Sequence, residues 1–475
     1  MSERTYDLVV IGAGPVGENV ADRAEQGGLS VAIVESELVG GECSYWACMP
    51  SKGLLRAGAA LRAARAVDGA KQAVTGEVDV AGVLRRRDSL TSDWNDASQV
   101  EWLQGAGVDL VRGHGRLAGE KRVEVAAPDG SLTTLVARHA VAVCTGSAAL
   151  LPDVPGLAEV SPWTSREATA VQEVPGSLAI VGGGVVAAEM ATAFVDLGSE
   201  VTLIARSRLL GPMEPFAGDL VAQSLTDRGA RVLLHTDLVS ARRLDDGQVE
   251  LELSNDTRVR ADEVLVATGR IPRTEDLGLD AVGLEPGSWL DVDDTMLVRG
   301  SEWLYAVGDV NHRALLTHQG KYQARAAGDV IVARATGGTV DDAPWGAHVA
   351  TADHGAVPQV TFTDPEVASI GETEASARAA GRSIRVLDYD LSWIAGASTR
   401  SDAYTGQARA IVDEDRGVLI GATFVGADVG ELLHSATIAV VGEVPLVRLW
   451  HAVPSYPTLS EVWLRFLEVY GRPTA

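Results

Sequence analysis

Short apolar runs followed by helical patterns divide much of the chain into segments whose structure can be predicted. Residues 6–28 (YDLVVIGAGPVGENVADRAEQGG) begin with an apolar run that predicts a strand and continue, after several glycines, with a helical pattern. VAIVE, at residues 31–35, predicts the next strand. The same order of strand, glycines, helix and strand returns at residues 177–208. The pattern therefore predicts an α/β protein that contains two similar units.

The pattern changes in the last part of the chain. Residues 346–475 alternate β-like runs, such as ARAIVD and VLIGATFVG, with helix-like runs such as GELLHSATIAVVG. This alternation favours an antiparallel sheet with helices on one face.

Composition and charge limit the class of protein. A chain of 475 residues has room for roughly two to four domains. Its formal net charge of -25 argues against nucleic acid or an anionic membrane as a partner. Three cysteines in so long a chain suggest a reducing compartment. We see no targeting segment and no apolar stretch long enough to cross a bilayer, so we expect a cytoplasmic protein.

The first group of glycines has the spacing of a dinucleotide-binding turn. Gly12 would make the tight turn, Gly14 would let the backbone approach a pyrophosphate, and Gly17 would let the helix pack closely on the strand. The helix N-terminus then offers N–H groups and a positive dipole end to the phosphates. Glu35 would accept hydrogen bonds from a ribose hydroxyl. A glycine-rich loop without a ligand is the alternative, but the acid at this distance favours the dinucleotide site.

The second group repeats the spacing at Gly182, Gly184 and Ala187, but its second strand does not end on an acid. Arg206 and Arg208 follow instead. An acid at this place favours a free 2′-hydroxyl, whereas arginine favours a 2′-phosphate. The sequence therefore favours NADPH over NADH, unless the two arginines are solvated surface charges.

Two of the three cysteines, Cys43 and Cys48, lie in GGECSYWACMPSKG (40–53), directly before the helix-favouring residues 53–67. An ideal helix holds the Cα atoms of residues five apart at roughly 8–9 Å, but a disulfide needs about 4.4–6.8 Å. A bridge therefore requires a distorted first turn, which the flanking glycines and a proline would help. Strained bridges are easily reduced, and a helix N-terminus raises the thiolate fraction. These features predict a redox switch.

Two other interpretations of the cysteines are weaker. A zinc site needs about four ligands, and the third cysteine, Cys144, ends the strand-like run HAVAVC, where a small buried residue is expected. We therefore predict no metal site. A pair of inert thiols is the second alternative.

In order and spacing, these motifs resemble the class I pyridine nucleotide-disulfide oxidoreductases, the family of dihydrolipoamide dehydrogenase, glutathione reductase and mercuric reductase. The resemblance covers essentially the whole chain. Besides the two glycine turns, it rests on GGxCxxxxCxPSK (40–52), CTGS (144–147), VATGRIP (266–272), YAVGDV (305–310), VPQVTFTDPEVASIG (357–371) and YPTLSE (456–461).

The resemblance implies two Rossmann-like domains, for FAD and NADPH, and a C-terminal α+β dimerisation domain. The FAD domain would comprise residues 1–150 and 276–345, the NAD(P) domain residues 151–275, and the interface domain residues 346–475. The protein would be a homodimer in which each active site borrows Tyr456 and Glu461 from the partner.

The resemblance also implies cofactor contacts. The adenine of FAD would lie near His114 and Gly115, and the ribityl chain at Asp309. Lys52 would lie near flavin N5, paired with Glu189. A helix opening at Leu316, Thr317 and His318 would stabilise negative charge on the reduced flavin. The full set of expected cofactor contacts is Gly12, Gly14, Gly17, Glu35, Gly41, Lys52, His114, Gly115, Thr145, Gly146, Gly182, Gly184, Ala187, Arg206, Arg208, Gly269, Asp309, Leu316, Thr317 and His318.

By the same resemblance, Cys48 would be the charge-transfer thiol beside the flavin and Cys43 the interchange thiol that faces the substrate. Electrons would pass from NADPH to FAD, to the Cys43–Cys48 bridge and then to a small disulfide, a thiol-bound metal or another electrophile. A diaphorase that passes electrons directly to quinones or dyes, a metal-ion reductase, and a flavin redox sensor without turnover are the alternatives.

Two departures from the family pattern bear on the acceptor. The residues between the cysteines, Ser44 to Ala47, include Tyr45 and Trp46, which either narrow the approach of the substrate or pack within the helix. The usual C-terminal histidine is replaced by Tyr456, although Glu461 remains. A phenol titrates near pH 10 and is a poor base at neutral pH. His451 could substitute, but a solvated or packed histidine is the more ordinary interpretation.

Tyrosine at this place resembles mercuric reductases, whose acceptor is a metal ion. Those enzymes also carry a pair of cysteines near the C-terminus and an N-terminal metal-capturing domain, which this sequence does not show. The resemblance to mercuric reductases is therefore incomplete.

Overall fold

A computed structural model describes residues 2–472 of the chain. They form two compact units, each built from separate stretches of sequence. The first unit contains the residues up to Pro50, Asp88–Ala149 and Arg270–His354; the second contains Ser51–Arg87, Leu150–Gly269 and the residues from Gly355 onward. Each unit is described by itself.

The first unit is built on a seven-stranded sheet of order β3-β2-β1-β6-β5-β4, with β16 paired to β6. Strands β1, β2, β3, β6 and β16 run parallel, and β4 and β5 form antiparallel pairs with each other and with β6. The strands are β1 (Ser2–Ile11), β2 (Val31–Glu35), β3 (Asp109–Arg112), β4 (His114–Leu117), β5 (Arg122–Ala126), β6 (Leu132–Val143) and β16 (Leu304–Ala306). A short antiparallel pair, β7 (Ser147–Ala149) and β15 (Arg270–Pro272), lies outside this sheet.

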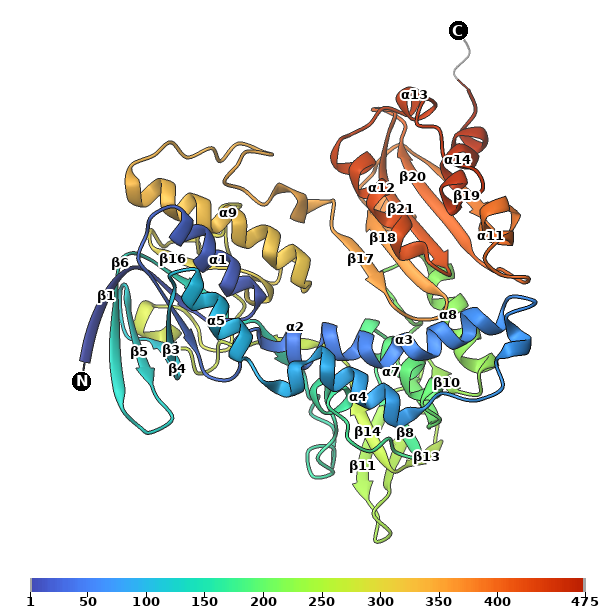
Figure 1. The fold of residues 1–475 in the computed structure, drawn as a ribbon, viewed down its shortest axis with the longest axis horizontal. Coiled ribbons are helices and arrows are strands. Elements are labelled where there is room, and N and C mark those ends of the chain that lie inside the picture. The colour runs from blue at the N-terminus through green and yellow to red at the C-terminus, as the bar shows by residue number, and fades with distance from the viewer. Residues whose placement is uncertain (1, 473–475) are drawn as a thin grey trace. The chain divides into compact units, whose positions relative to one another are not determined.

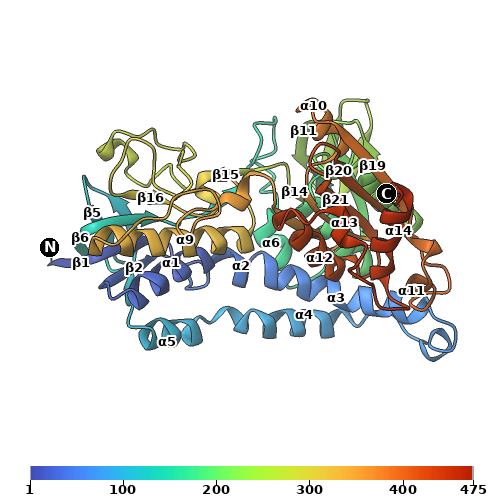
Figure 2. The same ribbon diagram turned by 90° about the horizontal axis from the view of Figure 1, so that it is seen from above.

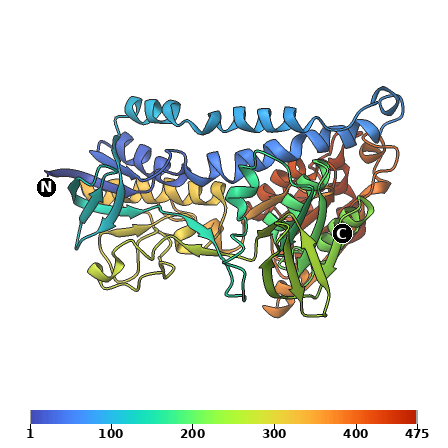
Figure 3. The same cartoon turned by 90° about the horizontal axis from the view of Figure 1, so that it is seen from below.

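Two helices of the first unit, α1 (Pro15–Gln26) and α9 (Thr317–Thr336), pack side by side, as all three ribbon views show (Figure 1, Figure 2, Figure 3). The central strand β1 is buried over Leu8–Ile11, which is why its sequence is a continuous apolar run rather than an alternating one. The remaining helical elements are α2 (Gly41–Tyr45), α5 (Ala97–Gly105) and the 3₁₀ turns Ser92–Trp94, Leu279–Val282, Asp309–Asn311 and Thr351–His354.

Strand register determines where the loops of the first unit meet. Ile11, the last residue of β1, pairs with Val34 of β2 and with Val143 of β6, and Ala306 of β16 also pairs with Val143. The carboxyl ends of four parallel strands therefore end at one edge of the sheet. Ligands of open α/β sheets bind at such an edge.

The second unit repeats the nucleotide-type arrangement on a four-stranded parallel sheet of order β10-β9-β8-β14. Its strands are β8 (Ser177–Val181), β9 (Glu200–Ala205), β10 (Arg231–Leu234) and β14 (Glu263–Val266), with a three-stranded antiparallel sheet formed by β11 (Leu238–Arg243), β12 (Val249–Leu253) and β13 (Arg258–Ala261). Its helices are α6 (Ser165–Thr169), α7 (Val185–Asp196) and α8 (Pro215–Asp227). Helix α3 (Cys48–Arg65), the 3₁₀ turn Lys71–Ala73 and α4 (Val80–Leu90) fall largely in this unit.

The C-terminal part of the second unit is a five-stranded antiparallel sheet of order β17-β18-β21-β20-β19. Helix α12 (Val429–Val441) packs on β18 and β21, and α14 (Val462–Tyr470) packs on β19. The strands are β17 (Pro358–Thr361), β18 (Glu366–Gly371), β19 (Ile384–Asp390), β20 (Gln407–Asp413) and β21 (Val418–Gly426); the short helices are α10 (Glu374–Ala379), α11 (Ala395–Ser398), α13 (Leu446–Leu449) and the 3₁₀ turns Leu391–Trp393 and Leu459–Glu461. The α/β class and the antiparallel C-terminal sheet predicted from the sequence are confirmed. Among the residues described, no helix combines the length and apolarity needed to span a bilayer.

Candidate active site: a dinucleotide cavity beside two cysteines

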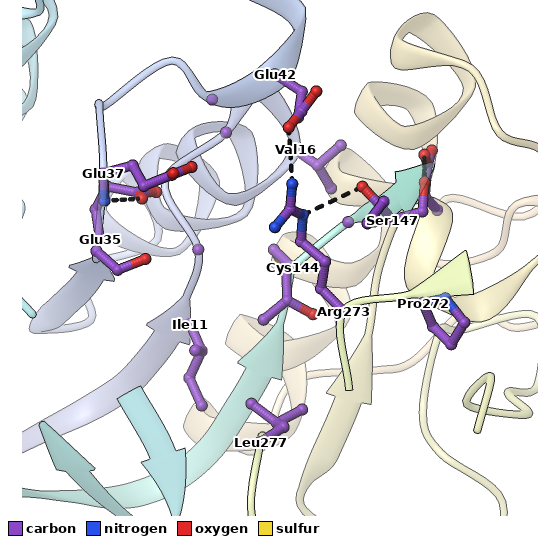
Figure 4. Close-up of a pocket in the computed structure, with 18 of the residues that line it drawn as sticks. Ile11, Val16, Glu35, Glu37, Glu42, Cys144, Ser147, Pro272, Arg273 and Leu277 are labelled. Carbon is purple, nitrogen blue, oxygen red and sulfur yellow. Dashed lines mark hydrogen bonds and ion pairs between the residues drawn. The ribbon is translucent and has the colours of Figure 1, made fainter. Parts of the chain in front are cut away.

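A cavity of about 550 Å³ opens at the carboxyl edge of the first sheet, a size typical of ligand sites. It brings together residues from several predicted motifs that are far apart in the sequence (Figure 4). The predicted site residues that line it are Gly12, Gly14, Glu35, Gly41, Cys43, His114, Gly115, Thr145, Gly146, Asp309 and Thr317.

The first glycine turn has the geometry that its spacing predicts. Gly12 has φ +102°, and a Cβ there would lie 2.5 Å from the carbonyl oxygen of Cys144. A Cβ on Gly17 would lie 1.9 Å from the carbonyl oxygen of Gly12. On Gly14, the N-cap of α1, the nearest atom to a Cβ is the Cα of Gly41 at 3.9 Å. Gly12 and Gly17 are therefore required by packing, whereas Gly14 faces open space.

Glu35 ends β2 inside this cavity. Its carboxylate accepts hydrogen bonds from the backbone N–H groups of Ala13, at 2.8 Å, and Glu37, at 2.7 Å. Burial raises the pKa of Glu35, and the two backbone hydrogen bonds act in the opposite direction. The carboxylate is thus fixed beside the glycine turn.

Two further polar groups line the cavity, one with a hydrogen-bond partner and one without a partner in the part of the chain that the structure describes. The carboxylate of Asp309 accepts a hydrogen bond from the Ser147 hydroxyl at 2.6 Å, and burial raises the Asp309 pKa. The Thr145 hydroxyl oxygen is buried and has no hydrogen-bond partner among the described residues. A buried polar atom without a partner on a cavity wall indicates that a ligand completes its hydrogen bonding.

The two cysteines lie on two consecutive helices. Cys43 lies within α2, which ends at Tyr45, and Cys48 is the first residue of α3. Trp46, between them, has the non-helical angles φ -136° and ψ 3°. The distortion that a bridge requires is therefore present in the backbone as a break between two helices. Both cysteines are half-buried.

Cys48 contacts the N-terminus of a long helix of the first unit. Its Sγ lies 3.5 Å from Oγ1 of Thr317, the first residue of α9. Leu316 is the N-cap of this helix, and the exposed His318 is its second residue. Because a helix N-terminus stabilises negative charge, this position favours a thiolate at Cys48.

The aromatic residues between the cysteines have different roles. Tyr45 is only 2% exposed and its backbone carbonyl accepts a hydrogen bond from the Trp94 indole N–H at 3.1 Å, so it packs within the unit. Trp46 is half-buried, with its ring centroid 5.7 Å from that of Tyr45. Only Trp46 is left to affect the approach of a substrate.

The second glycine turn repeats the first within the second unit. Gly182 has φ +144°, and a Cβ there would lie 2.2 Å from the carbonyl oxygen of Ala267, whereas a Cβ on Gly184 would meet nothing within 4 Å. Gly184 is the N-cap of α7, and Ala187 is fully buried. Gly269, at the end of this region, accepts a hydrogen bond from the N–H of Leu150 at 2.9 Å.

The two arginines after β9 differ in their surroundings. The Arg208 guanidinium donates hydrogen bonds to the carbonyl oxygens of Gly211, at 2.7 Å, and Met213, at 3.1 Å. Arg206 is exposed. Arg208 thus holds the following loop, and Arg206 projects into solvent.

Lys52 and Glu189 form an ion pair at 2.8 Å in the second unit. Glu189 is 4% exposed, and its other oxygen accepts a hydrogen bond from the N–H of Phe362 at 2.9 Å. The Lys52 ammonium also lies 4.7 Å from the centroid of the Phe362 ring. Glu189 and Phe362 together therefore fix the position of the lysine.

The two predicted C-terminal site residues, Tyr456 and Glu461, lie in different environments. Tyr456 is 77% exposed, whereas Glu461 is 5% exposed and accepts a hydrogen bond from the N–H of Gly396 at 3.0 Å. His451 is exposed.

The family model "Pyridine nucleotide-disulphide oxidoreductase" matches residues 6–333, and the model of that family's dimerisation domain matches residues 357–465. The chain belongs to the pyridine nucleotide-disulphide oxidoreductases. It is therefore an enzyme of this family, with Cys43 and Cys48 as its redox pair. FAD and a pyridine nucleotide are the cofactors that the family implies.

Several relatives in this family match almost the whole chain. A mercuric reductase of Streptomyces lividans is 33% identical, with 96% of this chain and 94% of the relative covered. A dihydrolipoyl dehydrogenase of Halobacterium salinarum is 31% identical, with 97% and 95% covered. A mercuric reductase of Staphylococcus aureus is 31% identical, with 96% and 81% covered.

A solved structure supports the fold. The Cu(II) complex of the HOCl-induced flavoprotein disulfide reductase RclA from Escherichia coli superposes with a TM-score of 0.83, at 22% identity, over 98% of this chain and 99% of RclA.

The residues around the cavity fit a bound FAD. Gly14 leaves space at the N-terminus of α1 for a pyrophosphate, and the buried Thr145 hydroxyl lacks a partner that a ligand can supply. The cavity is also lined by polar residues that were not predicted from the sequence: Ser36, Glu37, Glu42, Ser147, Arg270, Arg273, Glu275 and Asp276. Ser147, Arg270 and Glu42 lie in the CTGS, VATGRIP and GGxCxxxxCxPSK motifs, so their position was a usable signal, whereas Arg273 lies in no predicted motif.

Proposed function

We propose that the protein is an NADPH-dependent, FAD-containing reductase that uses the Cys43–Cys48 pair to reduce a small electrophilic acceptor. The observation that carries the proposal is the contact of Cys48 Sγ with Thr317 at 3.5 Å. Thr317 and Cys43 also line the cavity that holds the first glycine turn. Cys43 and the contact partner of Cys48 thus both lie in the wall of this cavity.

Each group of residues has a separate task. The flavin, when bound, supplies the two-electron redox chemistry. Gly12, Gly14 and Glu35 bind and orient its adenine nucleotide half. The N-terminus of α9 stabilises a thiolate at Cys48, and Cys43 is left to meet the acceptor. Glu189 would hold the Lys52 ammonium in the position that the family resemblance assigns beside the flavin.

The preference for NADPH depends mainly on Arg206. Arg208 is committed to two backbone carbonyl groups, so the exposed Arg206 is the cation available for a 2′-phosphate. Gly184 and the N-terminus of α7 would receive the pyrophosphate of the nucleotide.

A homodimer is the expected assembly, because the C-terminal part matches the family's dimerisation domain. In such a dimer, Tyr456 and Glu461 of one chain would act at the cavity of the other. The exposed phenol of Tyr456 can donate a hydrogen bond but is a poor base at neutral pH. An acceptor whose reduction needs little proton transfer, such as a metal ion or a thiol-bound metal, suits this arrangement better than a disulfide, whose reduction to two thiols takes up two protons. The similarity to mercuric reductases supports the same choice.

Direct transfer from the flavin to quinones or dyes is the second candidate, and it is also favoured by Tyr456 in place of a base. Replacing Cys43 with serine distinguishes reduction through the cysteine pair from direct transfer by the flavin. Reduction of a thiol-bound metal would be lost in Cys43→Ser, whereas quinone reduction would be unchanged if it bypasses the sulfur pair.

Alkylation of the cysteines before and after reduction of the protein with NADPH tests the main proposal. Iodoacetamide followed by peptide mapping should label Cys43 only after anaerobic reduction with NADPH. The buried Cys144, whose thiol pKa is raised by burial, serves as the internal control and should stay unlabelled in both samples. Equal labelling of Cys43 with and without NADPH would contradict the proposal.

A further inference from the structure

An ion pair inside the dinucleotide cavity has no role in the function described so far. Arg273 Nη2 lies 2.8 Å from Oε1 of Glu42, and Arg273 Nε donates a hydrogen bond to the carbonyl oxygen of Ser147 at 3.2 Å. Figure 4 shows the Arg273 guanidinium between Glu42 and Ser147. The pair joins the segment that carries Cys43 to the turn after β15.

The position of this pair is at the phosphate end of the cavity. Glu42 follows Gly41, and a Cβ on Gly41 would lie 2.9 Å from the Cα of Gly14. Gly14 is the N-cap of α1, a helix of 12 residues. Arg273 is therefore held by Glu42, which directly follows the place where the Cys43 segment contacts the first glycine turn.

Acidic side chains outnumber basic ones in the lining of the cavity, so a bound anion needs a cation nearby. Its described lining includes the acidic residues Glu35, Glu37, Glu42, Glu275, Asp276 and Asp309. Within that lining, the arginines are Arg270 and Arg273. A pyrophosphate that enters such an acidic cavity needs a cation to offset the repulsion.

Of the two arginines, Arg273 has the more exposed side chain, 40% against 25% for Arg270, and Arg270 lies closer to the Asp309 carboxylate. Arg270 donates to the Ser147 hydroxyl at 2.5 Å and to the Ser147 carbonyl at 2.8 Å, and it lies 3.8 Å from Asp309. Arg273 Nη1 has no acceptor among the described residues, and its side chain is 40% exposed. A guanidinium with open donors is suited to bidentate binding of phosphate oxygens.

We propose that Arg273 binds the pyrophosphate of the dinucleotide in this cavity and that Glu42 is the positioning residue that holds it there. The inference rests on the proposed function, which places FAD in the cavity. Glu42 fixes the guanidinium through Nη2, and Nη1 would then be available to a phosphate oxygen.

Binding of ADP and adenosine to the full chain, freed of flavin, tests the inference, because only ADP carries a pyrophosphate. Arg273→Gln should weaken ADP binding roughly 10- to 100-fold, the range for a lost charge-assisted hydrogen bond. It should change adenosine binding less than about twofold. Glu42→Gln removes a negative charge and keeps an acceptor, so it should bind ADP at least as tightly as the unchanged protein.

Arg122→Gln is the matched control. It removes an exposed arginine–glutamate pair of the same unit, at 2.9 Å from Glu3, and Arg122 does not line the cavity. It should bind both probes normally. If Arg273→Gln does not fold, Arg273→Lys should fold and show a smaller loss of ADP binding, because its ammonium keeps the charge without the planar fork.

Two results would overturn the inference: ADP affinity of the Arg273 variant within twofold of the unchanged protein, or an equal loss for adenosine, which indicates a purely structural latch. Either leaves the proposed function in place as long as the unchanged protein binds FAD. Failure of the unchanged protein to bind FAD would instead end the proposed function.

Discussion

Gly14 and Gly17 of the first glycine turn provide a sharp test, because the structure gives them opposite roles. A Cβ on Gly17 would lie 1.9 Å from the carbonyl oxygen of Gly12 and 3.3 Å from Cγ1 of Val10. The obstacle is backbone, which cannot rotate away. A Cβ on Gly14 meets only the Cα of Gly41 at 3.9 Å, and the backbone angles there, φ -72° and ψ 177°, suit alanine.

The expected magnitudes follow from these distances. Gly17→Ala should lower the free energy of unfolding by about 3 kcal/mol, the upper end of the usual cost of overpacking. Gly14→Ala should change it by less than about 0.5 kcal/mol, as is usual for substitutions that touch nothing. FAD binding to Gly14→Ala should nevertheless weaken by about tenfold or more, because the methyl group occupies the space where the pyrophosphate approaches.

Urea unfolding of the flavin-free protein measures the free energy of unfolding, and quenching of FAD fluorescence measures FAD binding. The reasoning is refuted if Gly14→Ala binds FAD normally, or if it unfolds as easily as Gly17→Ala.

Three further substitutions test other parts of the account. Arg206→Gln should lower kcat/KM for NADPH by about tenfold and leave that for NADH unchanged, since one charge-assisted phosphate contact is lost; equal losses for both nucleotides would refute this. Tyr456→His should raise the rate of reduction of a small disulfide by about 10²-fold, because it supplies a base that titrates near neutral pH; no gain would show that the C-terminal segment does not reach the sulfur pair. Burial raises the pKa of Glu18 from its ordinary value of 4.5 to about 7, and its Oε1 has no hydrogen-bond partner among the described residues. The native state therefore binds this proton more tightly than the unfolded chain, so its stabilising effect is present below pH 4.5 and is lost as the pH rises through 7. Between pH 5 and pH 8 the unchanged protein should lose about 2–3 kcal/mol of unfolding free energy that Glu18→Gln does not lose. The same pH dependence for both proteins in urea unfolding would contradict this.

The fold could be predicted from the sequence because each signal was local. A continuous apolar run before Gly12 marks a strand buried on both faces, and the same run precedes Gly182. The spacing of the glycines reflects contacts within one strand, turn and helix, so no knowledge of distant residues was needed.

The contents of the site could be predicted only where a residue belongs to such a local motif. Glu42 and Arg273 are 231 residues apart in sequence, and only the folded sheet brings them together. The commitment of Arg208 to backbone carbonyl groups depends on the path of a loop after β9. The burial of Tyr45 depends on its contact with Trp94, which no periodic pattern announces.

The central claim is that the sulfurs of Cys43 and Cys48 exchange electrons with a bound flavin, and anaerobic titration with NADPH tests it most directly. The account predicts that the protein takes up two electron pairs per flavin and develops a long-wavelength thiolate–flavin band, and that Cys48→Ser takes up one pair and loses the band. Uptake of a single pair by the unchanged protein, with the same spectrum as Cys48→Ser, would contradict the account.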